Sequence, residues 1–143
     1  MRRGSDTAVR CQLICGFASV YPEVLVVINQ ILEELIASTS GAHAVIFLDG
    51  DGEAIAHAGD SAADVKLVGA WKEIQFDHIK TIAERLKLGN VHAVLFSLEE
   101  GNELIVPVSG EYCLLLFMSS YANLHEAMGG LRKAIERLRK EIT

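Results

Sequence analysis

Histidines, cysteines and clustered carboxylates are the side chains of this sequence that could bind a metal or catalyse a reaction. The five histidines are His43, His57, His78, His92 and His125. No two of them have the H-x-x-x-H spacing with which a helix presents a pair of zinc ligands, and most fall on separate expected elements. We therefore interpret them as ordinary strand-face or surface histidines, and we predict no metal site.

The cysteine content favours a reducing compartment. Cys11 and Cys15 have C-x-x-x-C rather than C-x-x-C spacing, and Cys113 stands far from both in the sequence. An odd number of cysteines, in a chain long enough to bury a core, favours free thiols. We therefore expect the protein to be cytoplasmic.

The acidic run from Asp49 to Glu53 (DGDGE) is similar to the start of a calcium-binding loop. An EF-hand needs glycine at the sixth position, where Ala54 stands here, and a helix on each side. Glycines and aspartates of this kind also supply the backbone conformations of a tight hairpin. We expect a hairpin turn and no bound cation.

Sequence motifs of the common nucleotide-binding and hydrolytic sites are missing. The chain has no G-x-x-x-x-G-K-[ST] phosphate loop and no G-x-S-x-G nucleophile motif. Gly129 and Gly130 do not follow a strand in a βαβ unit, so they do not form a dinucleotide loop. We predict that the protein is not an enzyme and that it has no catalytic residues and no cofactor.

Length, composition and charge restrict the fold and the partners. The chain has 143 residues, half of them apolar and 22% charged, as expected of one folded domain. Its net charge of -6 argues against nucleic-acid binding, and no apolar run reaches the ~18 residues of a membrane span. We expect residues 1–20 to be a poorly specified N-terminal leader and residues 21–143 to form the domain.

The spacing of apolar residues predicts the element order α-β-β-α-β-β-β-α. Pro22 suits the first turn of a helix, and Asn123 with Glu126 resembles a capping box. Short turns between the last three strands indicate an antiparallel meander, with Pro107 at a strand end or a bulge. The expected helices are Glu23–Thr39, Ser61–Leu88 and Asn123–Ile142, and the expected strands are Ala42–Asp49, Glu53–Ala58, Val91–Leu98, Glu103–Val108 and Glu111–Ser119.

The middle helix, expected to begin at a cap formed by Ser61 and Asp64 and to stop at Gly89, carries more apolar surface than one contact with a sheet would cover. A main stripe is expected to face the sheet, which makes Trp71 a core residue. Apolar residues on both flanks of that stripe indicate a contact with a second protein. The stripe consists of Val68, Trp71, Ile79, Ile82 and Leu86, and the flanks consist of Leu67 with Ile74 on one side and Val65, Phe76 and Ala83 on the other.

These segments together resemble the roadblock/dynein light-chain family, and most nearly its bacterial MglB-type regulators of Ras-like GTPases. The resemblance covers roughly residues 21 to 142 and is clearest over Ile28–Asp60, the middle helix, His92–Met118 and the closing amphipathic helix. It implies an α+β fold with a five-stranded antiparallel sheet. The middle helix would cover one face of the sheet, and the first and last helices would cover the other.

The resemblance also implies a homodimer formed through the strand Val91–Leu98 and the middle helix, with a small Ras-like GTPase as a further partner. Charged residues beside the apolar flanks, Lys72, Glu73, Asp77, Lys80 and Glu84, would set specificity. Arg85 is the best candidate for an arginine finger, but MglB-type proteins reposition the GTPase's own switch elements, so we interpret it as structural. The expected residues of the dimer or partner interface are Leu67, Ile74, Phe76, Val91, Ala93 and Leu95.

Three functions are compatible with these observations. The leading hypothesis is a homodimeric regulator that binds a small Ras-like GTPase and modulates its activity indirectly. The second is a structural scaffold subunit with no effect on nucleotide turnover. The third is a small-ligand sensor, although no element offers polar groups that converge on an apolar cavity.

Overall fold

The computed structural model describes residues 22–60 and 65–142, with side chains of the middle helix described from Gly69 onward. The expected leader and the expected cap at Ser61 and Asp64 lie outside these residues. The predicted element order is confirmed. The elements are α2 (Pro22–Ser38), β1 (Ala42–Leu48), β2 (Ala54–Gly59), α3 (Val65–Arg85), β3 (Val94–Leu98), β4 (Gly101–Ser109), β5 (Tyr112–Met118) and α4 (Leu124–Ile142).

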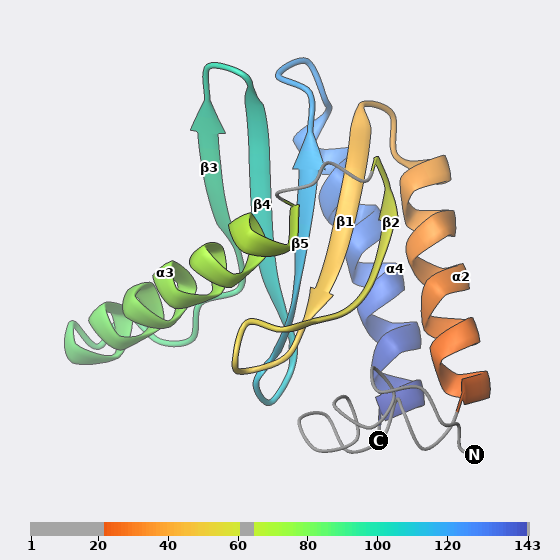
Figure 1. The fold of residues 1–143 in the computed structure, drawn as a ribbon. Helices are drawn as coiled ribbons and strands as arrows, with labels where there is room; N and C mark the ends of the chain where they lie inside the picture. The colour runs from red at the N-terminus through yellow and green to blue at the C-terminus, as the bar shows by residue number, and fades with distance from the viewer. Residues whose placement is uncertain (1–21, 61–64, 143) are drawn as a thin grey trace.

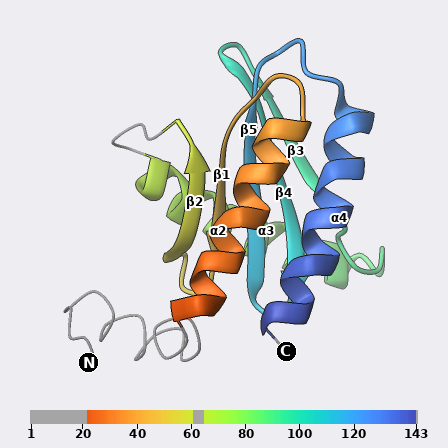
Figure 2. The ribbon, with the colours of Figure 1, turned by 90° about the vertical axis from the view of Figure 1, so that its right-hand side faces the viewer.

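The five strands form one antiparallel sheet in the order β2-β1-β5-β4-β3. Helix α3 lies on one face, and α2 and α4 lie side by side on the other, as expected (Figures 1 and 2). The sheet therefore has two free edges within the described residues, β2 at one side and β3 at the other. None of the described helices is long and apolar enough to cross a membrane.

The turn between β1 and β2 is the expected hairpin. Asp49 Oδ1 accepts hydrogen bonds from the backbone N–H groups of Asp51, at 2.9 Å, and Glu53, at 3.0 Å. Gly52, with φ of 78°, lets the turn approach α3, because a Cβ there would lie 3.1 Å from Ala70 Cα. The carboxylate of Asp49 therefore holds its own turn in place.

Two further local predictions are confirmed, one of them in part. A register shift between Pro107 and Ser109 places a bulge in β4, where proline's missing N–H disturbs the ladder least. The cap of α4 forms because Asn123 Oδ1 accepts the N–H of Glu126 at 3.0 Å. The Glu126 carboxylate does not complete the box, since it accepts the N–H of Ser40 at 2.7 Å instead. This bond ties α4 to the segment that follows α2.

The sheet separates two apolar cores. The larger core lies under α2 and α4 and includes Ile28, Leu32, Leu131 and Leu138, all fully buried. Helices α2 and α4 approach closely at Gly130, where a Cβ would lie 3.1 Å from Leu35 Cδ1. The smaller core lies under α3 and consists of Ile46, Leu48, Phe76, Ile105, Cys113 and Leu115.

The C-terminal end of α3 differs from the prediction in how it stops. The N–H of Lys87 donates to the carbonyl of Glu84, and that of Leu88 donates to the carbonyl of Ala83, the pattern of a Schellman cap. Lys87 has φ of 58° and occupies the left-handed position of the cap. Gly89, the expected stop, lies beyond the cap, in the connection to β3.

Candidate interaction surface

Strand β3 is the first component of the candidate surface, because it forms the free edge beside α3. The strand begins at Val94 rather than at the expected Val91, so Val91 and Ala93 belong to the connection that precedes it. Leu95 is 42% exposed and Leu98 is 47% exposed. An edge strand with exposed leucines is a template for pairing with another chain.

Helix α3 crosses the sheet obliquely, and its C-terminal end extends past β3 (Figure 1). A crevice of about 860 Å³ lies beneath this end and separates it from the β4–β5 turn and from Arg139 of α4. Leu86 and Leu88, at the end of the overhang, are both well exposed. The last turns of α3 therefore do not pack on the sheet of the same molecule.

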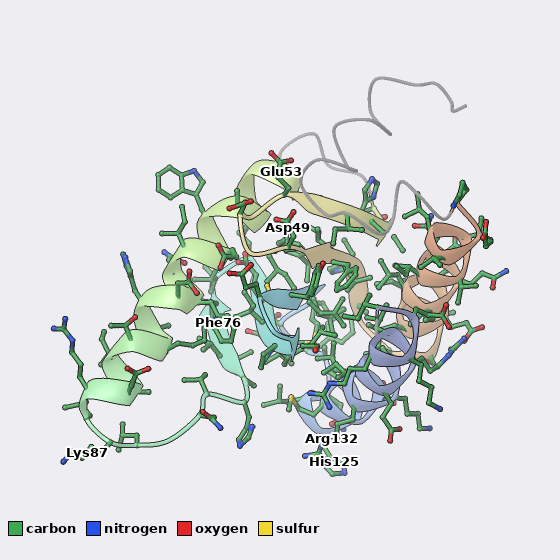
Figure 3. All side chains as sticks on the ribbon, turned by 90° about the horizontal axis from the view of Figure 1, so that it is seen from below. Asp49, Glu53, Phe76, Lys87, His125 and Arg132 are labelled. Carbon is green, nitrogen blue, oxygen red and sulfur yellow. The ribbon has the colours of Figure 1, made fainter. Side chains whose placement is uncertain are left out.

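The face of α3 that lies on the sheet is the predicted flank with Phe76 and Ala83, not the predicted main stripe, of which only Ile79 is half-buried among the described side chains. Trp71 was expected in the core but is 61% exposed, and Ile82 is 55% exposed. Phe76 was expected on a flank, where a second protein would cover it, but it is 1% exposed and lies between α3 and the sheet (Figure 3). The outward face of α3 is formed by Trp71, Ile74, His78, Ile82 and Leu86.

Small residues account for this rotation. A Cβ at Gly69 would lie 3.2 Å from Leu48 Cδ2 and 3.3 Å from Ile46 Cδ1, so α3 rests on the sheet through a position that has no side chain. Phe76, two turns later, fills the adjacent space. A prediction from helical periodicity counts large apolar residues, so it did not identify a contact face that begins at a glycine.

Beneath α3, Lys72 connects the helix to the β3–β4 edge. Its ammonium lies 3.3 Å from Glu103 Oε1 and 3.9 Å from the centroid of the Phe96 ring. The side chains of Lys72 and Glu103 are only 14% and 17% exposed. A charged pair this far from water retains much of its attraction, and the ring face adds a cation–π contact.

Glu73 is the least expected residue of this layer. It was predicted on the charged rim but is buried beneath α3. Burial, assisted by the nearby carboxylate of Asp77 and opposed by Lys80, raises the pKa of Glu73 to about 7. Burial also raises the pKa of the Cys113 thiol to about 12, so this thiol is protonated and inert at neutral pH.

The six predicted interface residues do not form one surface. Ile74 and Leu95 are exposed, Val91 and Ala93 are half-buried, and Phe76 belongs to the core. The side chain of Leu67 lies outside the described part of the chain. Sequence reasoning missed Phe96 and Glu103, because no local spacing signals that Lys72 meets a strand about 30 residues further on.

The described part of the chain contains no candidate metal-binding site. Among residues 22–60 and 65–142, no three His, Cys, Asp or Glu side chains gather closely enough to hold a metal ion. The candidate surface thus consists of the edge of β3, the outward face of α3 and the charged layer between them.

Solved structures are similar to this chain in fold. A roadblock/LC7 domain from Streptomyces avermitilis has 13% identity and a TM-score of 0.74, over 78% of this chain and 94% of that one. MglB from Myxococcus xanthus has 17% identity and a TM-score of 0.76, over 84% and 90%. MglC from the same organism has 27% identity and a TM-score of 0.56, over 78% and 96%.

No family model matches the sequence, and no curated protein matches it either. The structural likenesses nevertheless agree with the element order, the five-stranded sheet and the placement of the helices. The chain therefore has the roadblock fold that its sequence resemblance implied.

Proposed function

We propose that this protein is a cytoplasmic homodimeric regulator that binds a small Ras-like GTPase through its paired α3 helices. The observation that carries the proposal is the apolar outward face of α3 beside the free edge of β3. An exposed apolar row of this size on a small domain is typical of a protein-interaction surface. The resemblance to MglB-type regulators supplies the class of partner.

The dimer is proposed to form at β3. Pairing of two such edges makes one continuous sheet and removes both edges from solvent. It also places a second copy beneath the overhanging end of α3, where Leu86 and Leu88 are exposed. One contact would thereby cover the strand edge and the unsupported turns of the helix.

The GTPase is proposed to contact the outward face of the two α3 helices. Trp71 and Ile82 are the anchors of this surface, in place of Phe76, which is already buried. Aromatic and aliphatic anchors carry most of the affinity at such interfaces, while exposed charges such as Asp77 and Arg85 tune partner choice. The effect on hydrolysis is indirect, because binding favours the switch conformation for which the regulator has the higher affinity.

Light scattering tests the homodimer. At micromolar concentration the protein should have twice the 15.6 kDa chain mass. A monomer under those conditions would contradict the proposal.

Titration tests the GTPase surface, using the candidate GTPase and the variants Trp71→Ala and Ile82→Ala. Each should weaken binding by about 1–3 kcal/mol while the dimer mass is unchanged. Arg137→Ala is the matched control, because Arg137 pairs with Glu34 on the opposite face of the sheet. Loss of binding in the control alone would place the GTPase on the α2–α4 face.

A hydrolysis assay separates regulator from scaffold. GTP turnover by the GTPase should change when the wild-type dimer is added and should change less with Trp71→Ala. Tight binding without any change in turnover would favour the scaffold function instead.

A further inference from the structure

The turn at the end of β3 determines which of its backbone groups face outward. Leu98 pairs with Gly101 across the two-residue turn Glu99–Glu100. A two-residue hairpin closes on a hydrogen-bonded pair, and hydrogen-bonded pairs alternate with non-hydrogen-bonded pairs along an antiparallel ladder. Phe96, which pairs with Glu103, therefore directs its N–H and C=O toward β4.

By the same alternation, Leu95 and Ser97 direct their N–H and C=O groups away from β4, toward the free edge. A two-fold axis perpendicular to the sheet brings a second β3 alongside in the antiparallel direction, with the two α3 helices on the same face. The outward N–H and C=O groups of the two strands can bond to each other only when Leu95 or Ser97 of one copy lies opposite a residue of the other copy whose backbone groups also point outward. Any register centred on a residue of β3 fulfils this condition, and the three that pair most of the strand are centred on Leu95, Phe96 or Ser97.

We propose that two copies of this chain pair through β3 in the register centred on Phe96. This inference rests on the proposed homodimer and specifies its geometry. Leu95 then pairs with Ser97 of the second copy, and Phe96 faces its own counterpart across the axis. All five residues of β3 take part. The other two registers shorten the contact, because they match Ser97 with Ala93, before the strand, or Leu95 with Glu99, in the turn.

Side-chain packing favours the same register. Val94, Phe96 and Leu98 share the α3 face of the strand, and Leu98 is 47% exposed. Centring on Phe96 sets Leu98 against Val94 of the second copy and sets the two aromatic rings side by side, a favourable cross-strand pair. Each ring already has the Lys72 ammonium of its own α3 over its face, 3.9 Å from the centroid.

Disulfide cross-linking distinguishes the three registers, because only a residue on the two-fold axis can bond to its own copy. Paired strand residues have Cα atoms about 4.5–5.5 Å apart, within the range that a disulfide spans. The background is Cys11→Ser with Cys15→Ser, and Cys113 is retained because it is buried. The variants Leu95→Cys, Phe96→Cys and Ser97→Cys are oxidised separately and examined by non-reducing electrophoresis.

Phe96→Cys should become mainly a covalent dimer, while the other two single variants should remain largely uncross-linked. Self-linking of Leu95→Cys or of Ser97→Cys as the main species would overturn the register. If Phe96→Cys does not fold, as judged by circular dichroism, the double variant Leu95→Cys with Ser97→Cys should cross-link although neither single variant does. Failure of the folded double variant to cross-link would also overturn it.

Light scattering of the cysteine background separates failure of the register from failure of the proposed function. A dimeric mass without any of these cross-links would place the interface elsewhere and refute the register alone. A monomeric mass would refute the homodimer itself.

Discussion

Lys72 holds its ammonium over the ring of Phe96, 3.9 Å from the centroid, and thereby fastens the middle helix to the outermost strand of the sheet. The same ammonium pairs with Glu103 on the neighbouring strand, at 3.3 Å. Glu103 Oε1 accepts no hydrogen bond within the described residues. Lys72 therefore acts as the counter-ion of a largely buried carboxylate.

Replacing Lys72 with methionine should destabilise the fold by about 2 kcal/mol, because it leaves the charge of Glu103 buried without a counter-ion. Urea unfolding at pH 7 measures the change. The double variant Lys72→Met with Glu103→Gln should recover most of the loss. Arg137→Met is the control, since its pair with Glu34 is exposed and should contribute less than about 1 kcal/mol. Equal losses in both single variants would contradict the buried character of the Lys72 pair.

Stability should fall as the pH rises through the range in which Glu73 ionises. The folded pKa is about 7 against an ordinary value of 4.5, because burial disfavours the carboxylate. A raised pKa means that the folded state binds the extra proton, so the favourable contribution is complete below about pH 4.5 and is lost as the pH passes 7. Glu73→Gln should therefore be more stable than the wild type at pH 8, by roughly 2–3 kcal/mol, and similar to it near pH 4.5.

Unfolding free energies of both proteins across this pH range test the assignment. Glu84→Gln is the control, because Glu84 is exposed on the same helix. An unchanged pH profile in Glu73→Gln would show that folding does not raise the pKa of Glu73.

Phe76→Ala should lower the stability of the fold much more than Trp71→Ala. Phe76 is fully buried, so its truncation should cost about 3–5 kcal/mol of stability. Trp71 is mostly exposed, so its truncation should change stability by less than about 1 kcal/mol. Thermal and urea unfolding of the two variants measure the contrast. A loss of stability for Trp71→Ala as large as that for Phe76→Ala would instead support the helix rotation expected from periodicity, with Trp71 in the core.

Two glycines with similar backbone angles should respond differently to alanine. Gly59 has φ of 90°, and a Cβ there would lie 2.2 Å from the carbonyl oxygen of His43. Gly89 has φ of 92°, and no atom lies within 4 Å of its Cβ position. Gly89→Ala should cost only the backbone strain, about 1–2 kcal/mol, whereas Gly59→Ala should cost clearly more because β1 and β2 must separate. Similar unfolding midpoints for the two variants would contradict the close approach of β1 at Gly59.

Elements governed by local chemistry could be predicted from the sequence. The hairpin at Asp49, the cap at Asn123 and the bulge at Pro107 each depend on residues a few positions apart, and the structure has all three. The order of the helices and strands follows from periodicities of the same short range.

The rotation of α3 could not be predicted in this way, because it depends on a contact between elements. Trp71 and Ile82 are large and apolar, so periodicity placed them inside, whereas the close approach at Gly69 turned them outward. The buried carboxylate of Glu73 has the same origin. Its position follows from the helix rotation, whereas its residue type alone would place it in water.

The two edge strands of the sheet, β2 and β3, differ in the side chains that they offer for pairing with a strand of another molecule. Strand β2 is built mostly from alanine and glycine around one buried isoleucine, so it offers few large side chains for contact across a junction. Strand β3 carries the leucines and the phenylalanine. The proposed two-fold junction would use the same strand on both molecules, so addition would stop after one step and open-ended fibre formation through β3 would be blocked.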